Sequence, residues 1–247
     1  MFHGLLVVDK PSGITSRDLV NQVQRLLPRT VKIGHTGTLD PLATGVLVLC
    51  IGAATKQAAI IQGLGKSYRA RIRLGARSNT DDADGVVTVQ DDTLIPNETK
   101  IDEALQPFLG RIMQRPPAYS AVKVGGRRAH ALARRGQTVE ISPRWVQIDS
   151  IRRLNFDWPM LDLEIECGKG TYIRSLARDL GERLGVGGLI QSLRRTRVGP
   201  FKEDHAVLFT GSMAEDRSIL MSKLLPIEQV AELISSPPRG HGKHRGL

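Results

Sequence analysis

The sequence predicts an α+β fold in which a mixed, largely antiparallel central sheet is flanked by helices. Segments with strand-like patterns outnumber helical ones along the 247 residues, and neither internal repeats nor a regular alternation of strands and helices occurs. Such a distribution is typical of α+β proteins. The length allows one large domain, which is expected to span residues 1–235. Residues 236–247 are rich in Pro, Gly and basic residues, so a flexible tail is expected there.

The first expected elements are a strand, a helix, a second strand and a short helix. Residues 5–8 form an apolar, strand-like run. Residues 15–18 read Thr-Ser-Arg-Asp, which is the pattern of a capping box, so a helix is expected to begin there and to stop at Pro28. Residues 46–51 are suited to a buried strand and residues 53–62 to a short helix.

Two later segments alternate between apolar and charged residues. Residues 67–74 and residues 161–167 show the period of two that a half-buried strand requires. The second of these leads into Gly168-Lys169-Gly170 and then into a helical pattern that ends at Gly185. A lone Gly-x-Gly is weak evidence for phosphate binding, and the P-loop and dinucleotide fingerprints are absent, so no nucleotide cofactor is indicated.

The composition indicates a protein of the cytoplasm. The longest apolar stretch, residues 46–54, is too short to span a bilayer, and the first residues lack the pattern of a signal peptide. Two cysteines, Cys50 and Cys167, are too few for a disulfide framework, and both lie in strand-like patterns. We expect them to be core residues.

The positive charge of the chain favours a nucleic acid partner. The net charge is +10 and the isoelectric point is about 10.1. The positive surplus is uneven along the chain. Residues 111–139 contain seven Lys and Arg residues and neither Asp nor Glu, whereas residues 79–103 are acidic. Concentrated positive charge binds phosphates and releases counterions. The alternative is a basic face that is merely solvated.

The most informative local feature is the loop formed by residues 34–45. It holds three Gly residues, Gly34, Gly37 and Gly45. It also places one carboxylate, Asp40, directly before Pro41 and just ahead of the apolar run. Proline biases the preceding residue toward an extended or turn conformation, so the carboxylate is expected to sit on a stiff bend. The alternative is an Asp-Pro turn without chemistry, because these residue types are common in loops.

The remaining motifs narrow the chemistry. The sequence has no His-Glu-x-x-His pattern, no Cys/His metal spacing and no Gly-x-Ser-x-Gly elbow, so neither a metal site nor a serine triad is expected. A basic protein with one positioned Asp suggests covalent or proton-transfer chemistry on a nucleic acid. Such an Asp needs a nearby arginine to stay ionised when water is excluded, and Arg174 is a candidate. Spacing alone does not show whether Arg174 meets Asp40.

The loop closely resembles the signature of the TruB-type pseudouridine synthases. The resemblance extends over roughly residues 4–200, through six segments that read Leu6-Val7-Val8-Asp9-Lys10-Pro11-Ser12-Gly13, Gly34-His35-Thr36-Gly37-Thr38-Leu39-Asp40-Pro41-Leu42-Ala43-Thr44-Gly45, Lys66-Ser67-Tyr68-Arg69-Ala70, Thr80-Asp81-Asp82-Ala83-Asp84-Gly85, Pro117-Ala118-Tyr119-Ser120-Ala121-Val122-Lys123 and Lys169-Gly170-Thr171-Tyr172-Ile173-Arg174-Ser175. It implies the pseudouridine synthase fold. It also implies conversion of uridine 55 in the T loop of tRNA to pseudouridine, without cofactor, metal or guide RNA.

The resemblance implies roles for individual residues. Asp40 is expected to be the catalytic nucleophile, attacking ribose or base, or else the base that generates a glycal. Tyr68 is expected to stack on the target uracil, and Arg174 to pair with Asp40. His35 is expected to fill the space that the flipped uridine leaves. Lys10 and Tyr172 are expected to support the site. The alternatives are that Lys10 is a turn residue and that Tyr68 is a core residue.

The resemblance also implies an RNA-binding surface. Residues 111–139 match the family's thumb-like insertion, which grips the T-stem loop of tRNA. The basic residues expected to contact RNA are Arg127, Arg128, Arg134, Arg135, Arg194 and Arg195. No full C-terminal PUA domain is expected after residue 228, and a monomer is expected. The alternatives are a non-catalytic tRNA-binding or tRNA-folding chaperone, a synthase acting on another RNA, and a guide-dependent synthase in a ribonucleoprotein.

Overall fold

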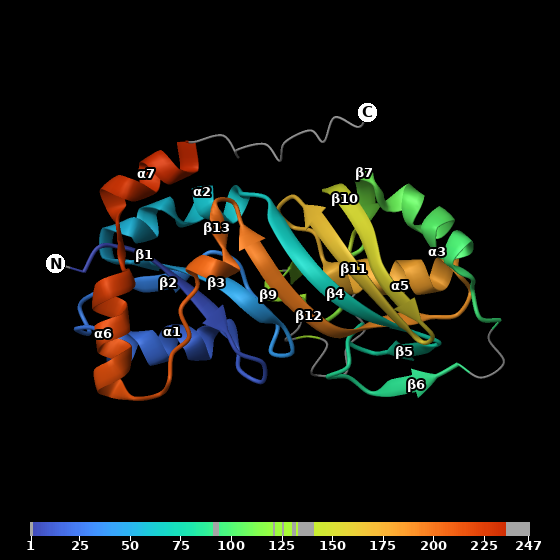
Figure 1. Ribbon diagram of the computed structural model, residues 1–247, viewed down its shortest axis with the longest axis horizontal. Helices are drawn as coiled ribbons and strands as arrows, with labels where there is room; N and C mark the ends of the chain where they lie inside the picture. Colours follow the sequence, from blue (N-terminus) through green and yellow to red (C-terminus); the bar gives the residue numbers. More distant parts are fainter. Residues whose placement is uncertain are drawn as a thin grey trace, which may run out of the picture. The chain divides into compact units, whose positions relative to one another are not determined.

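The computed structural model describes residues 2–90, 94–120, 122–124, 126–129, 132 and 141–235 (Figure 1). The chain divides into two compact units. The first unit is Met1–Asp40, Gly45–Leu64 and Arg197–Leu247, and the second unit is Pro41–Thr44 and Gly65–Thr196. Whether residues 1–235 act as one catalytic domain stays a prediction. Among the described residues, no helix is both long enough and apolar enough to cross a membrane.

The first unit is built around a central antiparallel strand. Strand β1 (Gly4–Lys10) pairs with β3 (Thr44–Ile51) on one side and with β14 (Leu225–Pro226) on the other, and β2 (Ile33–His35) pairs with β3. Almost every side chain of β1 and β3 is buried, as expected for continuous apolar runs. Both predicted strands are therefore confirmed.

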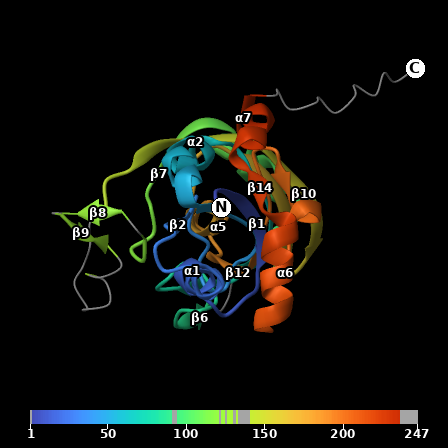
Figure 2. The ribbon, with the colours of Figure 1, turned by 90° about the vertical axis from the view of Figure 1, so that its left-hand side faces the viewer.

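Helices surround β1 in the first unit (Figure 2). Helix α1 (Ser16–Arg25) begins at the predicted capping box, in which the Thr15 hydroxyl accepts from the Asp18 amide at 3.0 Å and the Asp18 carboxylate accepts from the Thr15 amide at 2.9 Å. The short helix expected over residues 53–62 is found as two pieces. The remaining elements of this unit are η1 (Gly52–Gln57), α2 (Ala58–Gly63), β13 (Phe201–Lys202), η3 (Glu203–His205), α6 (Met213–Lys223) and α7 (Ile227–Ser235).

The second unit contains a five-stranded stretch of sheet. The strand order is β12 (Gly188–Val198), β4 (Lys66–Leu74), β11 (Met160–Cys167), β10 (Arg144–Asp157) and β7 (Gly110–Gln114). The β4/β11, β11/β10 and β10/β7 pairs are all antiparallel. Both alternating segments of the sequence are thus strands, and β4 buries Tyr68, Ala70, Ile72 and Leu74 as its pattern predicts.

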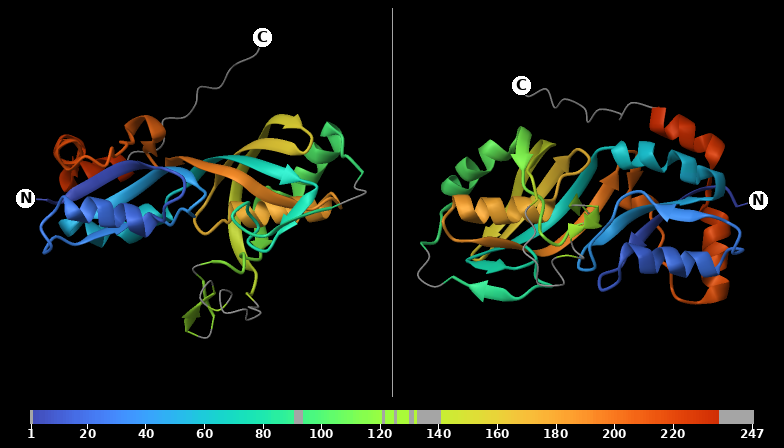
Figure 3. Two further views of the ribbon diagram at one scale, coloured as in Figure 1. Left: turned by 90° about the horizontal axis from the view of Figure 1, so that it is seen from below. Right: turned by 180° about the vertical axis from the view of Figure 1, so that it is seen from behind.

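Two helices lie side by side on one face of this stretch of sheet (Figure 3). Helix α3 (Glu98–Leu105) is capped by the Asn97 side chain and runs into η2 (Gln106–Phe108). Helix α5 (Ile173–Arg183) follows the Gly168–Gly170 turn, as predicted. A Cβ atom at Gly181 would collide with the backbone of Gly187 and Gly188, so the helix packs against the start of β12 at backbone distance.

Two small sheets complete the second unit. Strand β5 (Ala76–Ser78) pairs with β6 (Val87–Val89), and β8 (Lys123–Val124) pairs with β9 (Arg127–Arg128). The residues between β5 and β6 form turns and bends, with an isolated bridge between Asp82 and Ile190 of β12. The range expected to be a thumb-like insertion, residues 111–139, begins inside β7, so its first four residues belong to the main sheet of this unit.

Candidate active site

Several polar contacts of the second unit lie at the first turn of α5. The turn before it relies on Gly170, which adopts a φ of 83° that favours glycine. The Thr171 hydroxyl donates to the Gly168 carbonyl at 3.1 Å, and the Arg144 guanidinium donates to the Gly170 carbonyl at 2.8 Å. These bonds fix the direction in which the following helix enters the site.

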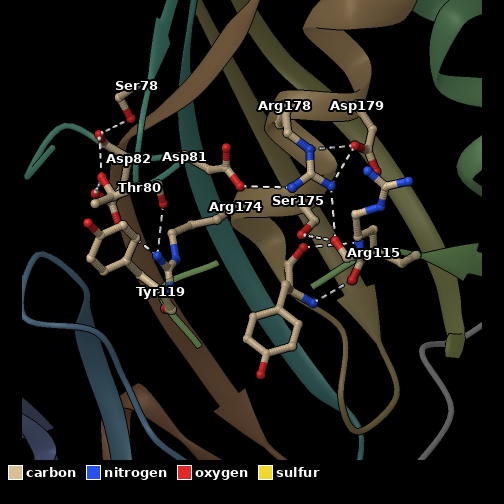
Figure 4. Close-up of polar contacts among 12 residues, drawn as sticks. Ser78, Thr80, Asp81, Asp82, Arg115, Tyr119, Arg174, Ser175, Arg178 and Asp179 are labelled. Atoms are coloured by element: carbon tan, nitrogen blue, oxygen red, sulfur yellow. Dashed lines mark hydrogen bonds and ion pairs between the residues drawn. The ribbon is translucent and has the colours of Figure 1, made fainter. Parts of the chain in front are cut away.

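Arg174 is buried at the centre of this region (Figure 4). One terminal nitrogen, Nη1, donates to the Thr80 carbonyl at 2.9 Å and lies 3.3 Å from the Asp82 carboxylate. The other, Nη2, donates to the Tyr119 carbonyl at 2.9 Å. The side chains of Arg174 and Asp82 are 6% and 5% exposed, so this is a buried ion pair whose cation also binds two carbonyls. A buried charge with several partners is held in one orientation.

The loop that carries Asp82 is itself held by short contacts. The Thr80 hydroxyl donates to the Asp82 carboxylate at 2.5 Å, the Asp84 amide donates to it at 3.2 Å, and the Ser78 hydroxyl donates to the Asp82 carbonyl at 2.6 Å. A Cβ atom at Gly85 would collide with the side chains of Asn79 and Thr80. The Asp82 carboxylate is therefore fixed before any substrate arrives.

Tyr172 lies at the N-terminal end of α5. Its amide donates to the Gln114 side chain at 2.8 Å, and its carbonyl accepts from the same side chain at 3.1 Å. The Arg144 guanidinium lies 5.0 Å from the centre of the Tyr172 ring, within the range of a cation–π contact. The strand β7 therefore positions this aromatic ring through Gln114.

Tyr68 belongs to β4, where it pairs with Ile165 of β11, and it is 7% exposed. Its burial agrees with the alternative that Tyr68 is a core residue, and a buried tyrosine can also form one wall of a base pocket. Stacking of Tyr68 on a uracil stays a prediction.

The loop that carries Asp40 belongs largely to the first unit. The Ser16 hydroxyl, at the start of α1, donates to the Leu39 carbonyl at 2.9 Å and accepts from the Leu39 amide at 2.8 Å. The Thr36 hydroxyl and amide both donate to the Val48 carbonyl of β3, at 3.2 and 3.0 Å. The loop is thus tied to a helix and a strand, and Asp40 is half-buried at the residue after the Ser16 contact. The predicted pairing of Asp40 with Arg174 stays a prediction.

Lys10 and His35 occupy defined positions in the first unit. Lys10 is fully buried, and its Nζ atom donates to the carbonyls of Pro11 and Ile14 at 2.8 and 2.7 Å. These contacts agree with the alternative that Lys10 is a turn residue. His35 ends β2, is half-buried and pairs with Leu49 of β3. Their supporting roles toward a substrate stay predictions.

The basic residues expected to contact RNA fall into three groups. Arg127 is exposed on β9, next to Arg128. Arg194 is half-buried and Arg195 is 2% exposed, both on β12. Burial of Arg195 does not support a direct phosphate contact. The predictions for Arg134 and Arg135 fall outside the described residues.

Sequence reasoning missed the acid that Arg174 meets in the second unit. Asp82 lies in the segment Thr80-Asp81-Asp82-Ala83-Asp84-Gly85, and the family resemblance of that segment is the signal that could have found it. Tyr119 contributes through its backbone carbonyl, which no side-chain pattern announces. In the part of the chain that the structure describes, no three His, Cys, Asp or Glu side chains are grouped so that they could hold a metal ion.

Comparison with known proteins adds a family assignment to this geometry. Residues 24–173 match the model of the TruB family pseudouridylate synthase N-terminal domain, and residues 174–232 match that of the tRNA pseudouridylate synthase B C-terminal domain. The tRNA pseudouridine synthase B of Xanthomonas axonopodis pv. citri is 47% identical over 228 residues, which are 92% of this chain and 74% of that protein. The protein of the same name from Corynebacterium diphtheriae is 51% identical over 211 residues, 83% of this chain and 70% of that protein.

Solved structures give the same fold. The chain is similar to one in a structure titled "Crystal Structure of a Cbf5-Nop10-Gar1 Complex", with a TM-score of 0.71 and 29% sequence identity. The similarity covers 94% of this chain but only 62% of that chain, so this chain spans less than two thirds of it. The predicted α+β fold with a largely antiparallel sheet is confirmed.

Proposed function

This chain belongs to the TruB family of pseudouridylate synthases, and from that premise we propose that it isomerises uridine 55 in the T loop of tRNA to pseudouridine. The observation that carries the proposal is the coincidence of two facts. The relatives named tRNA pseudouridine synthase B match most of the chain, and the matching motifs at residues 80–85, 117–119 and 172–175 converge on one buried arginine, Arg174.

The proposed chemistry needs one carboxylate and no redox step. Asp40 is assigned as the nucleophile, which assists cleavage of the N-glycosidic bond of the flipped uridine. The released uracil turns so that C5 forms the new bond to C1′ of the ribose. C5 then loses its proton and N1, whose bond to the sugar was broken, gains one, so the reaction is a net isomerisation. Tyr68 is assigned to stack on the uracil, and Arg174 to pair with the Asp40 carboxylate. The route of attack by Asp40, on ribose or base or through a glycal, is left open.

The fixed surroundings of these residues support the assignment. Leu39, the residue before Asp40, is hydrogen-bonded to the Ser16 hydroxyl through both its amide and its carbonyl. Arg174 is held by two carbonyls and the Asp82 carboxylate. Groups that are already oriented need no reorganisation when charge develops in the transition state. The proposed substrate agrees with the net charge of +10, because phosphate contacts position RNA on a basic surface.

The proposed partner is tRNA, bound through its T-stem loop by exposed basic residues such as Arg127. We assign a monomer that works in the cytoplasm, where its substrate is found, without a guide RNA.

The direct test uses an unmodified tRNA transcript with no added cofactor or metal. We expect the wild-type protein to form one pseudouridine per transcript, at position 55, and to leave a transcript carrying cytidine 55 unchanged. Pseudouridine at another position would assign a different target. Tight tRNA binding without any pseudouridine formation would replace the enzyme by a tRNA-binding or tRNA-folding chaperone.

A further inference from the structure

A second arginine lies one turn after Arg174 on the same helix and binds the same two segments. Arg178 Nη1 lies 2.9 Å from the Asp81 carboxylate, next to the Thr80 and Asp82 that hold Arg174. Arg178 Nη2 donates to the Arg115 carbonyl at 2.9 Å, in the segment that leads to Tyr119. Residues four apart lie on the same face of a helix, so both arginines face these segments together.

Two adjacent carboxylates therefore divide between two arginines. Figure 4 shows Asp82 beside Arg174 and Asp81 directed toward Arg178. The Asp81 side chain is 14% exposed and that of Arg178 is 21% exposed, so solvent screens this pair only partly. Arg178 is bound in turn by Asp179, whose carboxylate accepts from Nε at 2.8 Å.

The backbone holds Asp81 in an unusual conformation beside Arg178. Asp81 has a φ of 61°, in the left-handed region that residues other than glycine rarely adopt. Its carbonyl accepts from the Ile190 amide of β12 at 3.1 Å, which anchors the strained residue to the sheet. Burial raises the pKa of Asp81, and the positive charges of Arg178 and, more weakly, Arg174 oppose that effect. Both cations thus act on this one carboxylate.

We propose that Arg178 is a positioning residue for the reaction: it holds and neutralises Asp81, so that Arg174 stays with Asp82. Without Arg178, the half-buried Asp81 carboxylate still attracts the Arg174 guanidinium, and that attraction would draw the guanidinium away from its position. The proposal rests on the proposed function, because its consequence for turnover requires Arg174 to serve the active site.

The test compares Arg178→Met with the double variant Asp81→Asn Arg178→Met. We expect Arg178→Met to lower kcat by about tenfold or more with KM within about twofold, because small misplacements of catalytic groups are costly. The double variant removes the competing negative charge, and its kcat is expected to return to within about threefold of the wild type. Arg183→Met makes the same change at an exposed position of the same helix and serves as the matched control.

A role that is only structural predicts a different pattern. If Arg178 merely supported the fold through the Arg115 carbonyl, Asp81→Asn would not restore kcat, and that result would overturn the proposal. Unchanged kcat in Arg178→Met would overturn it as well. Thermal unfolding of every variant shows whether any loss of kcat comes from loss of fold.

A second readout does not depend on turnover. The Nε–Hε resonance of Arg174, identified by its absence in Arg174→Gln, is expected to shift in Arg178→Met and to return in the double variant. If the wild type forms no pseudouridine, the proposed function fails, and this resonance still decides the role of Arg178. An Arg174 resonance that stays unmoved in Arg178→Met would contradict the proposal.

Discussion

At the scale of single residues, the second unit contains more buried charge than its alternating strands suggest. Lys66 and Arg195 are 7% and 2% exposed, and Arg174 and Asp82 are buried as an ion pair. Buried charges are costly unless they are held by partners, so each is a sensitive position for substitution. Two consequences follow, one for stability and one for turnover.

Lys66 should make stability depend on pH. Burial first, and then the charge of Arg195, lowers the pKa of Lys66 to about 8 from an ordinary value of 10.5. Between these values the unfolded chain binds more protons than the folded one, so the free energy of unfolding rises as pH rises from about 8 to 10.5. The full effect is roughly 3 kcal/mol at 1.36 kcal/mol per pKa unit.

We expect Lys66→Met to remove this rise. Urea unfolding of the wild type and of Lys66→Met at a series of pH values measures the free energy of unfolding. The difference between the two curves of free energy against pH isolates Lys66 from other groups that titrate in the same range. Parallel curves from pH 7 to 10.5 would show that Lys66 has an ordinary pKa.

Asp82 should matter for turnover. Asp82→Asn removes the carboxylate that lies 3.3 Å from the Arg174 guanidinium, and breaking a buried ion pair costs about 3–5 kcal/mol of stability. We expect kcat for tRNA to fall by about tenfold or more. Asp84→Asn changes an exposed carboxylate of the same loop and is the control. Equal activities of Asp82→Asn and Asp84→Asn would show that Asp82 has no part in the reaction.

At the scale of elements, helix α1 links folding to the position of the loop that carries Asp40. Thr15 caps the helix, whereas its neighbour Ser16 holds both backbone groups of Leu39. Removing a cap costs about 1 kcal/mol, and leaving buried backbone groups unsatisfied costs about 1–3 kcal/mol.

The two neighbours should therefore differ in their effect on turnover. Thr15→Ala and Ser16→Ala are both expected to lower the melting temperature, but only Ser16→Ala is expected to lower kcat, by several fold. The comparison requires kcat of both variants to be measured at a temperature well below their melting temperatures. If the two variants lose activity in proportion to stability, the Ser16 contact has no special part in placing the loop.

The sequence predicted the elements that local patterns determine. The capping box at residues 15–18, the buried strand at residues 46–51, the alternating strand at residues 67–74 and the helix after Gly170 are all present. These features depend on neighbouring residues, so they can be read along the chain. The roles of individual site residues came from the family resemblance and stay predictions.

Contacts between distant segments could not be predicted from patterns. Arg174 binds the carbonyls of Thr80 and Tyr119, which lie 94 and 55 residues away and leave no mark in side-chain identity. Exposure also escaped prediction: Arg195 belongs to a basic cluster in the sequence but is buried, because β12 turns it inward. Residues 111–114 looked like part of a basic insertion, whereas pairing with β10 makes them a strand of the sheet.

At the scale of the whole molecule, the charge of +10 should govern affinity for RNA. Each phosphate contact releases counterions, so binding of tRNA is expected to weaken by about tenfold or more between 50 and 200 mM salt. Arg127→Gln should reduce the slope of log K against log salt by about one if this exposed residue contacts a phosphate. Filter binding over a salt series gives both values, and a flat response in the wild type would exclude a phosphate-binding surface.

The Asp40 carboxylate is proposed to perform the isomerisation of uridine 55. Its most direct test measures pseudouridine at position 55 of a tRNA transcript for the wild type, for Asp40→Asn and for Asp204→Asn, an exposed carboxylate of the first unit. We expect Asp40→Asn to form no pseudouridine while its affinity for tRNA stays within a few fold, and Asp204→Asn to match the wild type. Pseudouridine formation by Asp40→Asn at the wild-type rate would show that the Asp40 carboxylate does not perform the reaction.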